Sequence, residues 1–181
     1  MLPDASSPEK IAGDWRIMLM VEVNTWIQQN PSLFVPIVWS WTSDDQKALQ
    51  VTPLRDILKV KQEELPGLFA YNTNTNSVFR YPDSLDDAAN ISPELVMMWG
   101  KKVVVQGEID ALQKRLDDRS NESVKEEDKL SEEEANKILA HFEKMKPEVV
   151  QLEAAIAEMK ELFKEHNPFA DLVNEKDHHK Q

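Results

Sequence analysis

Cysteine is absent from all 181 residues of this chain. Disulfide bridges, thiol catalysis, thiol–disulfide exchange, iron–sulfur ligation and cysteine-based zinc sites are therefore excluded. Glycine is also scarce, and its 4 copies, at positions 13, 67, 100 and 107, stand apart from one another. A phosphate-binding loop needs several glycines close together, so the sequence contains no such loop.

Basic residues and long apolar runs are in short supply too. Lys and Arg number 21 against 33 Asp and Glu, which gives a net charge of −12. Nucleic acids and anionic membrane surfaces require a basic footprint, so we expect neither as a partner. No run approaches the ~18 apolar residues of a membrane span, so we expect no membrane insertion. The start, MLPDASSPEK, has neither the basic segment nor the apolar core of a secretory signal.

Candidate catalytic and metal-binding side chains are equally sparse. A metal site on a helix needs His and Glu at helical spacing, and an EF-hand loop needs alternating oxygen ligands, a glycine and a distal glutamate. The sequence offers neither a complete His/Glu metal set nor an EF-hand loop, and no Gly-x-Ser-x-Gly nucleophile elbow occurs either. We therefore predict no catalytic residue, no cofactor and no metal ligand. The side chains considered for these roles are His141, His166, His178, His179, Asp44–Asp45, Asp86–Asp87 and Asp117–Asp118.

The first part of the chain alternates between predicted helices and strands. Apolar residues that recur every three or four positions predict helices, and short apolar or β-branched runs predict strands. This alternation is typical of an α/β domain with some parallel pairing. In chain order the predicted elements are a helix at 10–29, a strand at 34–41, a short helix at 53–60, strands at 67–71 and 78–81, and a helix that starts at 92.

The two strands within residues 67–81 form the most patterned segment. An asparagine-rich tract separates them, and asparagine tolerates the positive φ that hairpin turns require. A short turn joins the strands, so they must be antiparallel. Pro66 stands at their entrance, where a missing N–H costs least. In the earlier strand, Trp39 and Trp41 share one face, which predicts core packing for both, whereas an exposed one would anchor a partner.

The C-terminal part of the chain predicts long helices. The capping box formed by Ser131 and Glu134 starts one of them, and Pro147 is expected to break or kink it. An apolar stripe with 3-4 spacing then predicts either packing within the chain or docking on another subunit. As candidate interaction residues this stripe contributes Val149, Leu152, Ile156, Met159 and Phe163.

The order of the predicted elements, with Leu65-Pro66 just before the hairpin, resembles the C-terminal portion of a thioredoxin fold. In that family a cis-proline precedes the fourth strand, and the resemblance covers roughly half of this chain. The strand after NPSLF resembles the redox-inactive domains of protein disulfide isomerase relatives and calsequestrins. The segment QNPSLFVPIVW…SDDQKAL is also similar to small thioredoxin-like accessory subunits of respiratory complex I and mitochondrial ribosomes.

The resemblance implies an α/β fold, with a partial or divergent thioredoxin-like sheet, flanking helices and a C-terminal coiled-coil-like helical arm. The family's Cys-x-x-Cys pair is missing, and its opening strand, helix and central strand have no counterpart before Lys10. Three explanations stay open: the chain is a fragment of a longer protein, another chain supplies the central strand or a helix, or the sheet has three strands. The predicted parts are a flexible tail at 1–9, the thioredoxin-like domain at 10–106, a helix extension and polar linker at 107–130, a helical hairpin or arm at 131–168 and a flexible tail at 169–181.

These observations favour a protein that acts through contacts with other protein subunits and is not an enzyme. The expected role is an accessory or structural subunit of a larger assembly. The alternative is a redox-inactive chaperone or low-affinity calcium-binding protein of the disulfide isomerase or calsequestrin type. The two roles imply a mitochondrial or an endoplasmic reticulum lumenal location respectively, with the cytoplasm as a third option.

Overall fold

The structure, a computed structural model, describes residues 14–29, 56, 58, 59, 61, 67–121, 123, 125 and 129–178, without the side chains of 175–178. The predicted strand at 34–41 with Trp39 and Trp41, the tail at 1–9 and Pro66 lie outside the described residues. So does most of the predicted helix at 53–60.

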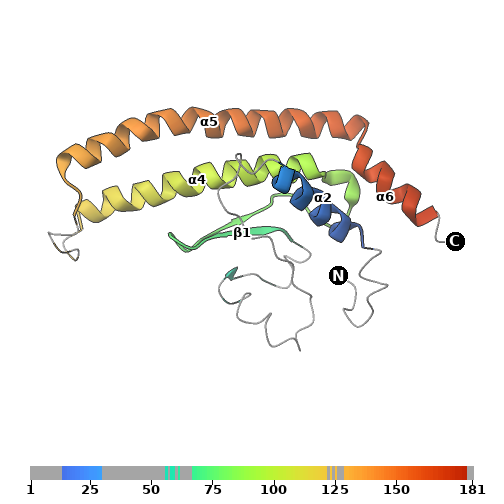
Figure 1. Cartoon of the computed structure of the whole chain (residues 1–181), viewed down its shortest axis with the longest axis horizontal. Coiled ribbons are helices and arrows are strands. Elements are labelled where there is room, and N and C mark those ends of the chain that lie inside the picture. The colour runs from blue at the N-terminus through green and yellow to red at the C-terminus, as the bar shows by residue number, and fades with distance from the viewer. Residues whose placement is uncertain are drawn as a thin grey trace.

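The described part of the chain is mostly helical and contains one small antiparallel sheet (Figure 1). This confirms the general α/β class, whereas the thioredoxin-like arrangement stays a prediction. In chain order the elements are α2 at Trp15–Gln29, β1 at Phe69–Asn72, β2 at Ser77–Arg80, the 3-10 helix η3 at Ala88–Asn90, α4 at Pro93–Arg119, α5 at Glu132–Glu165 and α6 at Pro168–His178.

Helix α4 is the element on which the others pack. Helix α5 runs antiparallel along one side of it, while α2 and the β1–β2 hairpin lie on the other side (Figure 1). Ser92 caps α4 by accepting a hydrogen bond of 3.2 Å from the Leu95 N–H, and Pro93 takes the first position, as predicted. The predicted domain boundary between residues 106 and 107 falls inside α4, so this one helix belongs to both parts.

Helix α5 is a single helix of 34 residues, so Pro147 does not break it. Proline removes one helical hydrogen bond and crowds the preceding turn. Buried residues on both sides of it, Met145 and Val149, nevertheless hold the helix against α4. The hairpin partner of α5 is therefore α4, and segment 131–168 does not fold back on itself at Pro147.

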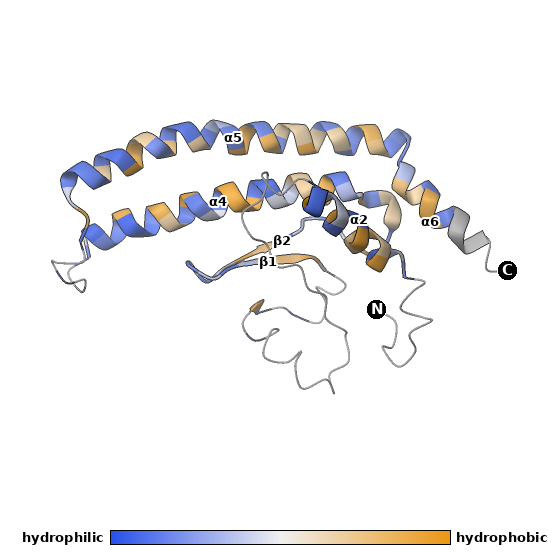
Figure 2. Ribbon diagram, in the orientation of Figure 1, coloured by the Kyte–Doolittle hydropathy of each residue, from blue (hydrophilic) through white to orange (hydrophobic). Residues whose placement is uncertain are grey.

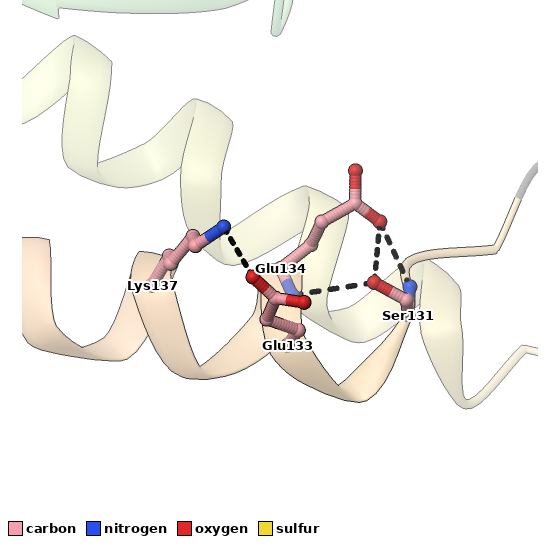
Figure 3. A network of polar contacts seen from close by, with 4 residues as sticks. All are labelled: Ser131, Glu133, Glu134 and Lys137. Atoms are coloured by element: carbon pink, nitrogen blue, oxygen red, sulfur yellow. Dashed lines mark hydrogen bonds and ion pairs between the residues drawn. The ribbon is translucent and has the colours of Figure 1, made fainter.

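The start of α5 carries the predicted capping box (Figure 3). The Ser131 hydroxyl accepts a hydrogen bond of 3.3 Å from the Glu134 N–H, and the Glu134 carboxylate accepts one of 3.0 Å from the Ser131 N–H. The hydrogen bonds from Ser131 stabilise the charged carboxylate and so lower the pKa of Glu134. Lys137 adds an ion pair with Glu133 one turn into the helix.

The β1–β2 hairpin confirms the predicted pair of antiparallel strands. Its register pairs Phe69 with Arg80 and Asn72 with Ser77. The asparagines act as expected: Asn76 has a φ of 57°, and the Asn72 side chain accepts a hydrogen bond from the Asn74 N–H. The hairpin touches α4 at Gly107, where the Asn72 amide donates to the Gly107 carbonyl at 3.2 Å. A β-carbon at Gly107 would come within 2.7 Å of that amide nitrogen, so glycine permits the contact.

The hydrophobic core lies where α2, the start of α4, the residues after β2 and α6 meet. Its members include Val23 and Ile91, both fully buried, and Phe169, which makes an edge-to-face contact with Trp15 at 6.3 Å. Tyr81 and Trp99 form a second edge-to-face pair at 5.5 Å. The pair of Trp15 and Phe169 joins segments far apart in the sequence, so the core closes the two ends of the described chain onto each other.

Asn167 is a buried polar residue that fastens α6 to the rest of the body. Its amide nitrogen lies 3.2, 3.0 and 3.0 Å from the carbonyl oxygens of Ala88, Ala89 and Ile91. Its side-chain oxygen accepts hydrogen bonds from the Phe169 and Ala170 N–H groups, which start α6. One side chain therefore caps α6 and satisfies carbonyl groups of the η3 segment.

Replacing Asn167 tests this connection. Asn167→Asp keeps the capping oxygen but turns an acceptor toward three carbonyl oxygens, so we expect the free energy of unfolding in urea to fall by about 2–4 kcal/mol. The exposed Asn136 of α5 provides the control, and Asn136→Asp should change stability by less than about 0.5 kcal/mol. Equal effects of the two substitutions would contradict the role of Asn167.

Removing Pro147 should stabilise the protein, because alanine restores the missing N–H and relieves the crowding inside α5. We expect Pro147→Ala to raise the free energy of unfolding by roughly 1–3 kcal/mol. Pro168, at the first position of α6, is the matched control, since proline is favourable there. If Pro168→Ala raised the free energy of unfolding and Pro147→Ala did not, α5 would not be continuous at Pro147.

Candidate functional site

The most distinctive feature of the molecule is a two-helix arm, which we define as residues 108–119 of α4 and 132–146 of α5. It extends past the β1–β2 hairpin, away from the body (Figure 1). Apolar residues recur along both helices up to the far end (Figure 2).

The two helices of the arm are not equally covered. On α5 the residues that face α4 follow 3-4 heptad spacing and are buried: Ala135, Ile138, Phe142 and Met145. Their counterparts on α4, Ile109, Leu112 and Leu116, stay half-buried. An apolar stripe is stable only when another element covers it, and a single partner helix covers one side. The α4 side of the arm therefore retains partly open apolar surface.

Polar pairs between α4 and α5 fix the antiparallel register of these two helices. Lys102 of α4 forms an ion pair of 2.6 Å with Glu153, and His141 Nε2 lies 3.2 Å from the Glu108 carboxylate. These side chains are largely exposed, so each pair contributes at most about 1 kcal/mol. Their value lies in alignment, because a shift of one helical turn would separate both pairs.

The predicted interaction residues continue the buried face of α5 toward its C-terminal end. Val149 is buried, and the other four are half-buried on the same side of the helix. The structure thus brings them together in packing within the chain, leaving little of this stripe open. The set consists of Val149, Leu152, Ile156, Met159 and Phe163.

The open apolar side chains lie elsewhere. On α5, Leu139 is 51% exposed, Val150 63% and Leu162 62%. Leu139 follows Ile138, which takes the buried position facing α4. Val150 was missed because it follows Val149, which takes the inward position. The heptad pattern could have identified Val150 as exposed, because it lies one residue after a position that faces α4.

A shallow hollow of about 290 Å³ lies between the end of β2, α4 and α5. Trp99, Ile156 and Ala157 line it, along with Lys102, Glu153 and Lys160. Tyr81 closes its floor; this residue is 7% exposed, and its hydroxyl has no hydrogen-bond partner among the described residues. Burial, with a smaller effect from the negative charge of Asp83, raises the pKa of Tyr81 well above its usual value.

The charged groups around this hollow neutralise one another. Asp83 Oδ2 is buried without a hydrogen bond of good geometry, yet it forms an ion pair with Lys160. Lys160 also lies 5.9 Å from the centre of the Tyr81 ring, and Lys102 is paired with Glu153. A tyrosine with a raised pKa holds its proton at neutral pH, so it does not act there as a base. The hollow is best described as a packing defect beside the core.

The two histidines whose side chains the structure describes, His141 and His166, are not brought together. His141 contacts Glu108 on the arm, and His166 contacts Asp171 at the start of α6, both on the surface. The described residues hold no group of three or more His, Cys, Asp and Glu side chains arranged to bind a metal ion. Among the described helices, none combines the length and the apolar character needed to cross a membrane.

No known protein family, curated protein or solved structure matches this chain. The functional argument therefore depends on the residues and geometry described above.

Replacing the buried Tyr81 tests the character of the hollow. A buried hydroxyl without a partner costs free energy, so we expect Tyr81→Phe to leave stability unchanged or raise it by about 1 kcal/mol in urea unfolding. Tyr71→Phe is the control, because its hydroxyl donates to Asn76 at 2.6 Å and its loss should be slightly destabilising.

The effect of Tyr81→Phe should also depend on pH. The folded-state pKa of Tyr81 lies above the unfolded value of about 10, so the wild-type protein loses stability as pH rises past that value. Phenylalanine does not titrate, and the stability difference between the two proteins should widen from pH 9 to pH 11, two values chosen to bracket about 10. A constant difference would show that Tyr81 is accessible to solvent.

Proposed function

We propose that this protein is a non-enzymatic interaction module, an accessory or structural subunit of a larger assembly. The observation that carries the proposal is the arm: two long helices that leave the body and cover their shared apolar stripe unequally. The rest of the described chain is small, and its hydrophobic core lies at the end of the α4–α5 pair opposite the tip of the arm. An arm of this shape adds little to that core, which favours a role in contact with other chains.

The partner that suits the arm is an amphipathic helix from another subunit. A third helix laid along Ile109, Leu112 and Leu116 would complete the coverage that α5 provides on one side. Leu139, beside the residues of α5 that face α4, would contact the same helix. Among the described residues of the arm, it is the one exposed large apolar side chain. Apolar anchors of this kind at the centre of an interface contribute most of its stability.

The thioredoxin-like resemblance remains our proposal for the body. It is supported by the antiparallel hairpin and by the helix that follows it, capped at Ser92. In that arrangement the lost cysteine pair leaves surfaces and no redox centre. The alternative role as a calcium-binding or chaperone-type protein receives no support from a cluster of carboxylates among the described residues.

Measurement of the native assembly tests this function. In an extract of cells that produce the protein, we expect the wild-type chain to elute from gel filtration at a mass well above that of the purified chain. Leu139→Glu places a carboxylate at the arm's apolar edge and should return most of the protein to the mass of the purified chain. The helix should tolerate the change, because the position is half exposed.

The matched control is Leu162→Glu, a change of the same kind at a more exposed leucine outside the arm. It should leave the assembly intact. Elution of the wild-type protein at the same mass in the extract and in pure form would contradict the proposed function. So would equal effects of the two substitutions, because the arm would then have no special part.

A further inference from the structure

The side of α5 that faces away from α4 has an unusual composition. We define this back face by the heptad positions 140, 143, 147, 150, 154 and 161, all of them exposed. No described element lies on that side of the helix (Figure 1). Outward positions of a surface helix are normally charged or polar. Here four of the six are apolar or small: Ala140, Pro147, Val150 and Ala154.

The charged residues beside the back face change sign along the helix. Lys144 lies before Val150 and Glu158 lies after it, on the same flank at equivalent heptad positions. Both side chains are exposed, and neither forms an ion pair with another described residue. The flank therefore presents a free positive charge on one side of Val150 and a free negative charge on the other.

We propose that the back face of α5 binds a second copy of this chain, with the two α5 helices antiparallel and a two-fold axis at Val150. A two-fold interface uses the same patch on both copies, so residues at similar distances from the axis meet in pairs. Lys144 of each copy then faces Glu158 of the other, which gives two identical ion pairs. Pro147 meets Ala154 beside the axis, and these small residues let the helices approach closely.

The charge order selects this occupant and this direction. In a parallel alignment the flank that carries Lys144 and Glu158 would face the opposite flank of the other helix, so these two residues would not pair with each other. The antiparallel alignment also pairs opposite ends of the helix macrodipoles. Val150, with 63% exposure the most open large apolar side chain described, comes to lie at the centre of the contact. The back face is separate from the surface of Ile109, Leu112, Leu116 and Leu139 in the arm, so this inference does not depend on the proposed function.

Sedimentation equilibrium of the purified full chain tests the proposal. We expect the wild-type protein to show a monomer–dimer equilibrium. Val150→Glu places two carboxylates together on the axis and should weaken the dimer at least about tenfold. Leu162→Glu changes an equally exposed leucine on a different side of the same helix, and it should leave the dissociation constant unchanged.

Charge reversal provides a test that loss of folding cannot imitate. Lys144→Glu alone sets two Glu–Glu pairs across the axis, and Glu158→Lys alone sets two Lys–Lys pairs, so each single variant should dimerise at least about tenfold more weakly. An equimolar mixture of the two variants forms two Glu–Lys pairs and should regain association as a heterodimer. The double variant in one chain should regain it as a homodimer.

Three results would overturn the proposal. The first is a wild-type chain that stays monomeric at every concentration reached. The second is a dimer that Val150→Glu leaves intact, because the chain would then associate through another face. The third is a mixture of the single charge variants that associates no better than either variant alone. None of these results bears on the arm, since the native assembly is tested separately by Leu139→Glu in a cell extract.

Discussion

The packing of α5 along α4 is the interaction on which the rest of this structure depends. It lets α4 be covered on two sides, by α5 on one and by α2 with the β1–β2 hairpin on the other. A small two-stranded sheet is not stable by itself, so it needs the helix behind it. The buried heptad of α5, from Ala135 to Val149, is regular enough to keep the helix continuous even through Pro147.

Two polar contacts complete what apolar packing begins. Asn167 satisfies carbonyl groups of the η3 segment and caps α6, and Asn72 bonds the backbone of α4 at Gly107. Both join parts of the chain that are far apart in sequence and allow one arrangement of donors and acceptors. Apolar contacts tolerate sliding, whereas a buried amide with no partner is costly, so these contacts define the position of α6 and of the hairpin.

The helices divide their surface between internal packing and external contact. The face of α5 that carries Val149 and Phe163 is used within the chain, which leaves the back face around Val150 and the edge of the arm at Leu139. The acidic surface, with a net charge of −12, keeps such a chain soluble and discourages unspecific association. Association then requires local complementarity, and the free charges of Lys144 and Glu158 provide it for a second copy.

The sequence by itself determined the features whose cause is local. The Ser92 cap, the Ser131–Glu134 capping box, the asparagine turn and the heptad of α5 could all be predicted, because each depends on residues a few positions apart. The tertiary structure alone decided which side of α5 meets α4, and with it the exposure of Leu139 and Val150. It also decided that Pro147 stays inside a helix, that Asn167 and Gly107 carry long-range contacts, and that the Tyr81 hydroxyl is buried. These outcomes depend on partners that lie far away in the sequence, and no local pattern encodes where such partners will be.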